Sequence, residues 1–138
     1  LGPDQFRSFS TQYVQQIIDS YKYAGVDTVY HTCGNTMHLI DPMVEAGVGA
    51  ISLDSPETGV DMAQAAELAP DSVAVIGNVN PTAVMKDATA KQVYDVTFKL
   101  LEKMRDYPNF ILSTGCDLPP GTPMENMQAF MQAAREFK

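Results

Sequence analysis

The stretch Ser72-Val-Ala-Val-Ile-Gly-Asn-Val-Asn-Pro81 decides the predicted fold. Its first half, residues 72–76, is apolar almost throughout, which is typical of a strand that is buried on both faces of a parallel sheet. Polar and turn-forming residues follow directly, from Gly77 to Pro81. Strands of this type pack between helices, so the segment predicts an α/β fold.

The same alternation continues in both directions along the chain. Apolar residues at helical spacing, or alanine-rich runs, predict helices over residues 8–23, 37–46, 60–68, 90–104 and 124–137. Short β-branched or apolar runs predict strands over residues 27–30, 50–53, 72–76 and 110–112. We therefore expect one domain over residues 1–138 with four βα units and parallel strands. Periodicity alone fits either a small open sheet or half of an eight-stranded barrel, which typically needs about 250 residues.

Composition excludes several classes of protein. The chain has 138 residues, a formal net charge of -8, 45% hydrophobic residues and two cysteines. The negative charge predicts no nucleic acid partner and no attraction to an anionic membrane. No apolar run has the length of a membrane span and no signal peptide is visible, so we expect reduced thiols and a cytoplasmic protein. The chain begins with Leu1 rather than Met, which suggests a processed chain or a piece of a longer protein.

The chemistry is expected where the strands end, because the carboxyl ends of parallel strands carry the active site in this fold class. His31 and Cys33 follow the first predicted strand, and Cys116 follows the last. Alternation along a strand points residues i and i+2 to the same side, so His31 and Cys33 project together. With Cys116 they form a set of three zinc ligands that leaves one position open, as in catalytic zinc sites. The alternatives are cysteines that only fill a core, and a Cys33–Cys116 disulfide, which a reducing compartment disfavours.

Other polar residues near the strand ends are weaker candidates. Asp54 follows the second strand and is a candidate hydrogen-bond partner of the metal histidine, a transient fourth ligand or a substrate contact. The alternative is that Asp54 only shapes its loop and the start of the next helix. Asn78 and Asn80 either bind substrate or hold their loop. We assign Asp54, Asn78 and Asn80 to substrate binding. His38 and Glu57 are interpreted as surface or loop residues.

Three segments together resemble the uroporphyrinogen decarboxylase superfamily. They are His31-Thr-Cys-Gly-Asn35, Ile76-Gly-Asn-Val-Asn-Pro81 and Ser113-Thr-Gly-Cys-Asp-Leu-Pro-Pro-Gly-Thr-Pro-Met-Glu-Asn126. Within the superfamily the chain resembles the methylcobamide:coenzyme M methyltransferases and related corrinoid-dependent methyltransferases. That branch carries a His-x-Cys…Cys zinc motif, which His31, Cys33 and Cys116 match. The decarboxylases use no metal and typically carry histidine where this chain has Cys116.

The resemblance implies a fold and a reaction. The fold is the carboxyl-terminal half, strands five to eight, of a TIM (β/α)8 barrel, so the sheet should have two open edges. The missing amino-terminal half-barrel or a second copy of the chain should cover them. The reaction is transfer of a methyl group from a methylcobamide (corrinoid), carried on a partner protein, to a thiol such as coenzyme M, with Zn²⁺ bound by the three ligands. The alternatives are a metal-free decarboxylase of porphyrin biosynthesis and an inactive half-barrel. The predicted ligands lie on strands that are not neighbours, so the loops after these strands must lean inward.

Overall fold

The computed structural model describes residues 1–138. Four strands form one sheet in the order β1-β2-β3-β4, and every neighbouring pair is parallel. The strands are β1 (Val29–Thr32), β2 (Ala50–Leu53), β3 (Ala74–Val79) and β4 (Phe110–Thr114). The helices are α1 (Pro3–Phe6), α2 (Gln12–Tyr21), α3 (Ile40–Glu45), α4 (Met62–Leu68), α5 (Ala90–Met104) and α6 (Met124–Glu136). The predicted α/β fold with four parallel βα units is confirmed.

Three predicted strands have different bounds in the structure. The first begins two residues later than expected, at Val29, and runs to Thr32. The third runs on to Val79, because Asn78 and Val79 pair with Ser113 and Thr114 of β4. The fourth extends for the same reason. His31, Asn78 and Ser113, which the sequence places after the strands, therefore belong to the last residues of β1, β3 and β4, where regular pairing fixes the direction of each side chain.

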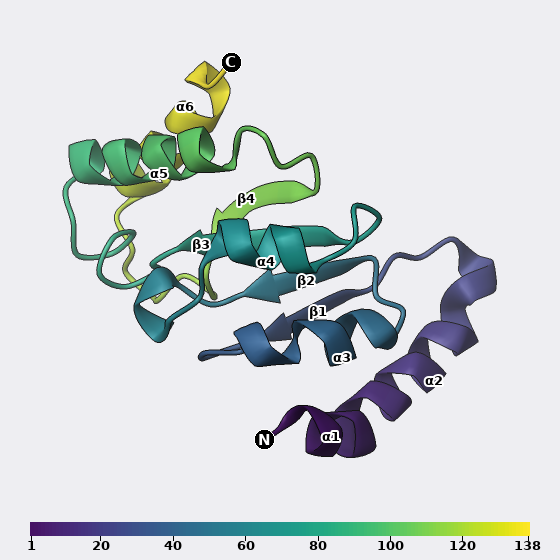
Figure 1. Cartoon of the computed structure of the whole chain (residues 1–138). Coiled ribbons are helices and arrows are strands. Elements are labelled where there is room, and N and C mark those ends of the chain that lie inside the picture. Colours follow the sequence, from purple (N-terminus) through teal and green to yellow (C-terminus); the bar gives the residue numbers. More distant parts are fainter.

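The helices cover one face of the sheet and leave the other open. In Figure 1, α3 and α4 lie against the same side of the strands, and α5 runs beside α6. The main core lies on this side: Ile51, Leu53 and Val75 pack with Ile40 and Met43 of α3 in a cluster of 16 buried residues. On the opposite face, Val29 and Ile111 remain 54% and 50% exposed. This exposed face corresponds to the inner surface of a barrel.

The helical segment at the amino-terminal end begins earlier than predicted. It starts at Pro3, passes through a π-helical turn over Arg7–Thr11 and continues as α2. Proline suits the first helical position because its ring fixes φ and its missing N–H has no helical partner there. One face of α2 packs Val14 and Ile18 on the core. Large apolar residues at a spacing of four are exposed along the π-helical turn and α2: Phe9, Tyr13, Ile17 and Tyr21.

The sheet has two open edges, as expected for a half-barrel. β1 pairs only with β2, and β4 pairs only with β3. Unpaired strand edges bind other strands readily, and natural proteins normally cover them. What covers these edges stays a prediction. No helix of the chain combines the length and apolar character that crossing a membrane requires.

Asp61 caps the amino-terminal end of α4 and supplies a first stability prediction. Its carboxylate accepts hydrogen bonds from the backbone N–H groups of Ala63 and Gln64, at 2.9 and 3.2 Å, and from Lys103 at 2.8 Å. The hydrogen bond from Lys103 is the main reason that the pKa of Asp61 lies below its usual value. We expect Asp61→Ala to lower the free energy of unfolding by about 1 kcal/mol at pH 7, as for other N-cap deletions.

The pH dependence of this effect has a defined sign. A carboxylate with a lowered pKa in the folded state stabilises the fold above its unfolded pKa and loses that contribution as pH falls. The difference between wild type and Asp61→Ala in urea unfolding should therefore shrink below about pH 4. Asp71→Ala, at an exposed position after α4, is the control and should leave stability unchanged. An Asp61→Ala protein as stable as this control would contradict the capping role.

Candidate metal centre

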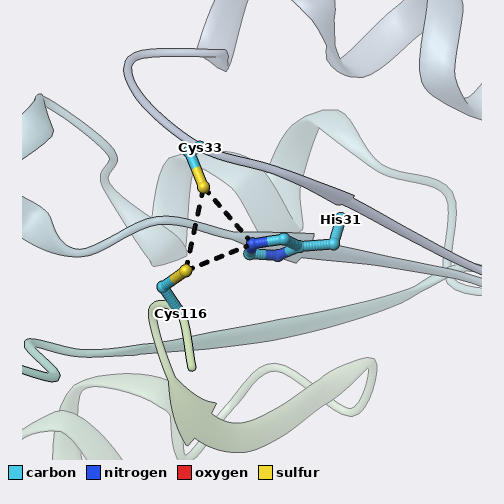
Figure 2. A group of neighbouring side chains, drawn as sticks. All are labelled: His31, Cys33 and Cys116. Carbon is cyan, nitrogen blue, oxygen red and sulfur yellow. Dashed lines mark hydrogen bonds between the residues drawn. The ribbon is translucent and has the colours of Figure 1, made fainter. Parts of the chain in front are cut away.

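The side chains of His31, Cys33 and Cys116 point toward one another at the carboxyl end of the sheet (Figure 2). The His31 Nε2 atom lies 3.5 Å from the Cys33 sulfur and 3.6 Å from the Cys116 sulfur. The two sulfur atoms are 3.8 Å apart, and both cysteines are free. Three soft or borderline donor atoms therefore form a small triangle near the protein surface.

The dimensions of this triangle fit a tetrahedral zinc ion. Zn–S bonds of about 2.3 Å and Zn–N bonds of about 2.0–2.1 Å place two sulfurs about 3.8 Å apart in a tetrahedron, and a sulfur and a nitrogen about 3.5 Å apart. The measured separations of 3.8, 3.5 and 3.6 Å agree with these edges. Two thiolates and an imidazole also suit zinc better than magnesium or calcium, which prefer oxygen ligands. The residues present thus fit the metal that the sequence predicts.

The ligands come together although two strands separate β1 from β4. His31 belongs to β1 and Cys33 follows directly, whereas Cys116 lies two residues beyond β4. The chain after β4 turns inward, held by a hydrogen bond of 2.8 Å from the Gly115 N–H to the Val79 carbonyl. The Thr114 hydroxyl donates to the Cys116 carbonyl at 2.8 Å and tightens the same turn. The loops lean inward as the predicted site requires.

Electrostatics at the site favour a bound cation. The pKa of the Cys33 thiol is raised, first by its hydrogen bond with Cys116, and further by partial burial and the charges of Asp54 and Asp117. Deprotonating both sulfurs beside these carboxylates would concentrate negative charge in a small space. A divalent cation would offset that charge and favour the deprotonated sulfurs.

A cavity of about 490 Å³ opens beside the three candidate ligands on the uncovered face of the sheet. His31 and Cys116 form part of its wall, and Asp117 is the only carboxylate that lines it. The remaining lining residues are Val29, Ser52, Ser113, Thr114 and Leu118. The cavity gives a small molecule access to the triangle of donor atoms.

Asp54, Asn78 and Asn80, which the sequence assigns to substrate binding, form hydrogen bonds with backbone groups of the chain. Asp54 accepts hydrogen bonds from the backbone of Gly34 and Ser55, both at 2.7 Å. Burial acts to raise the pKa of Asp54, but these hydrogen bonds outweigh it and the pKa lies below the usual value. Asn78 donates to the Asp54 carbonyl, and Asn80 accepts from two backbone N–H groups of its own loop. None of these three residues lines the cavity, and substrate contact by them stays a prediction.

Two further residues lie outside the site, as interpreted from the sequence. His38 Nε2 is 3.2 Å from the Leu1 carbonyl, and Glu57 is exposed in the short turn Pro56–Thr58. Sequence reasoning missed Ser52, whose hydroxyl lies 3.1 Å from His31 Nδ1. The available signal was its position as the only polar residue of the strand Ala50–Leu53.

The sequence model of the family described as uroporphyrinogen decarboxylase (URO-D) matches residues 1–137, which is nearly the whole chain. The chain belongs to the uroporphyrinogen decarboxylase family. This result confirms the resemblance noted in the sequence.

Relatives of this URO-D-family chain include both methyltransferases and decarboxylases. It is 30% identical over 138 residues to the methylcobamide:CoM methyltransferase MtbA of Methanosarcina acetivorans, and covers 38% of that protein. It is 31% identical over 142 residues to the uroporphyrinogen decarboxylase of Hordeum vulgare, and covers 40% of it. Each alignment takes in 100% of this chain.

A solved structure supports the same placement. A methyltransferase from Methanosarcina mazei superposes on 99% of this chain with a TM-score of 0.83 and 26% sequence identity. The chain corresponds to 38% of that structure. The predicted fold class, the carboxyl-terminal half of an eight-stranded barrel, agrees with this match and with the four parallel βα units.

Proposed function

We propose that the chain is the metal-binding part of a zinc-dependent methyltransferase, which transfers a methyl group from a methylated corrinoid to a thiol such as coenzyme M. The observation that carries the proposal is the triangle of His31, Cys33 and Cys116, whose edges match a tetrahedral zinc site. The methylcobamide:CoM methyltransferases among the relatives support the same reaction. The chain spans 38% of these relatives, so the activity proposed is that of a whole protein containing this part.

The three ligands define the chemistry that this part contributes. Zinc bound by one neutral imidazole and two thiolates would lower the pKa of an acceptor thiol at its open position. The cavity beside Cys116 gives the acceptor room, because it opens on the uncovered face of the sheet. The acceptor sulfur would then attack the methyl carbon as a thiolate, while the thiol proton passes to solvent. The methyl group would pass to this sulfur as the cobalt–carbon bond of the donor is broken, and the bonding electron pair would stay with the corrinoid.

The proposed partners follow from the open surfaces. A corrinoid protein would deliver the methyl donor over the carboxyl ends of the strands, where the ligands lie. An amino-terminal half-barrel, or a second copy of the chain, would cover the edges formed by β1 and β4. The free thiols of Cys33 and Cys116 suit a reducing compartment such as the cytoplasm.

A direct comparison of two substrates tests this proposal against metal-free decarboxylation. The whole protein that contains this chain is loaded with Zn²⁺ and mixed with methylcobalamin and 2-mercaptoethanesulfonate, or separately with uroporphyrinogen. We expect loss of methylcobalamin absorbance and formation of the methyl thioether, both abolished by a zinc chelator. Chelator-resistant release of CO₂ from uroporphyrinogen would instead favour the decarboxylase, a reaction named for several relatives.

A further inference from the structure

The end of β2 contacts all three candidate ligands or their immediate neighbours, although it contributes no ligand itself. We propose that the segment Ser52–Ser55 is the scaffold that holds His31, Cys33 and Cys116 at metal-binding separations, and that Ser52 orients the imidazole. The inference rests on the metal site proposed above. It makes Ser52 and Asp54 positioning residues.

Ser52 fixes the orientation of the histidine ring. In the ladder between β1 and β2, His31 pairs with Ser52, so both side chains rise on the same face. The Ser52 hydroxyl lies 3.1 Å from Nδ1, while Nε2 faces both sulfur atoms. A metal at Nε2 requires the ring proton at Nδ1, and the serine oxygen is placed to accept it. Metal-bound histidines usually donate this second N–H to a partner that sets the tautomer.

Asp54 fixes the loop that carries Cys33. Its Oδ2 atom accepts a hydrogen bond of 2.7 Å from the backbone N–H of Gly34, the residue after Cys33. Its own backbone is held in turn, because the buried Asn78 side chain donates to the Asp54 carbonyl at 3.0 Å. Cys33, which directly follows β1, is thereby tied through the end of β2 to the centre of the sheet.

The position of the third ligand, Cys116, depends on the close approach of the backbone at Gly115 to the backbone of Asp54 and Ser55. Gly115 is buried against the peptide between Asp54 and Ser55, and a Cβ atom there would lie 2.4 Å from the Ser55 nitrogen. The chain after β4 thus passes over the end of β2, which brings Cys116 across to Cys33. The same four-residue segment therefore explains how ligands from the two edges of the sheet meet.

Co²⁺ affinity tests the scaffold without requiring catalysis. Co²⁺ is titrated into the 138-residue chain and into each variant, with the sulfur-to-cobalt charge-transfer band and competition with a chromophoric chelator as readouts. We expect Ser52→Val to weaken Co²⁺ binding by about 10–100-fold, the usual cost of removing a hydrogen-bond partner of a metal ligand. Ser52→Thr keeps the hydroxyl and should restore affinity close to the wild-type value. Both substitutions suit a strand, so folding should be preserved.

Two matched controls separate positioning from general effects. Ser113→Val makes the same change in the wall of the same cavity and should leave Co²⁺ affinity unchanged, because no hydrogen bond joins Ser113 to a ligand. Asp54→Ala should weaken binding more than Asp117→Ala, which removes an equal charge without a bond to the Gly34 loop. Equal affinities for Ser52→Val and Ser52→Thr, together with equal affinities for Asp54→Ala and Asp117→Ala, would overturn the scaffold while leaving the metal site intact. A wild-type chain that fails to bind Co²⁺ would overturn the metal site itself.

Discussion

Replacing Cys116 by alanine should reduce zinc affinity by roughly a hundredfold to a thousandfold. Structural zinc sites with four ligands bind with about 10–16 kcal/mol, or about 3 kcal/mol for each ligand, and each 1.4 kcal/mol is a factor of ten. Cys116 supplies one of only three protein donors, with its sulfur 3.6 Å from His31 Nε2 and 3.8 Å from the Cys33 sulfur. Competition with a zinc-specific chromophoric chelator measures the loss.

The stability of the metal-free protein is the control for this variant. Cys116 is only partly buried and lies in a loop beyond β4, so its truncation should change urea unfolding of the apoprotein little. Methyl transfer by the whole protein should be lost together with the metal. A Cys116→Ala protein that binds zinc with wild-type affinity would remove Cys116 from the ligand set.

Gly115→Ala should impair both stability and metal binding. The added methyl carbon would lie 2.4 Å from the Ser55 nitrogen and 2.9 Å from the Asp54 carbonyl carbon. Both contacts are with backbone, so no flexible side chain can move aside and the two loops must separate. Forced overpacking of this type costs about 1–3 kcal/mol in unfolding free energy. Because the separation moves Cys116 away from Cys33, Co²⁺ affinity should fall as well.

Gly49→Ala provides a matched comparison at the opposite end of the sheet, where Gly49 directly precedes β2. A Cβ atom at Gly49 would meet only the Asp27 side chain, at an ordinary contact distance of 3.5 Å. This variant should retain the metal affinity of the wild-type chain and nearly all of its stability. If Gly115→Ala behaved like Gly49→Ala in urea unfolding and Co²⁺ titration, the close crossing of the two loops would have no role in forming the site.

Much of the architecture can be read from local sequence. The apolar run at 72–76 predicts a parallel strand that packs against helices. Burial on both faces is not found: Val73 and Val75 are buried, whereas Ala74 and Ile76 are only half-buried because the other face of the sheet is uncovered. The spacing of His31 and Cys33 predicts that both project together, because side chains alternate along a strand. The structure brings these two side chains and Cys116 together. These features depend on periodicity and composition, which a short segment carries by itself.

The roles of Ser52 and Gly115 beside the ligands depend on contacts between segments that are far apart in the sequence. Ser52 reaches His31 because the β1–β2 register pairs these two positions, and no local pattern in the strand Ala50–Leu53 specifies that register. Gly115 resembles an ordinary turn glycine in the sequence, yet its role comes from a neighbour sixty residues earlier, Ser55. Apolar patterning does not predict the last residues of β3 and β4, because polar residues such as Asn78 and Ser113 complete the ladder at the carboxyl ends of these strands.

The metal content of the purified chain tests the central claim most directly. The wild-type protein, prepared under reducing conditions and dialysed against zinc-free buffer, is analysed for metals by mass spectrometry, and its zinc environment by X-ray absorption. We predict one zinc per chain, bound by two sulfur atoms at about 2.3 Å and one imidazole nitrogen at about 2.0–2.1 Å, with a fourth light or exchangeable ligand. A chain that retains no zinc after reconstitution, or a zinc bound only by oxygen and nitrogen, would contradict the account.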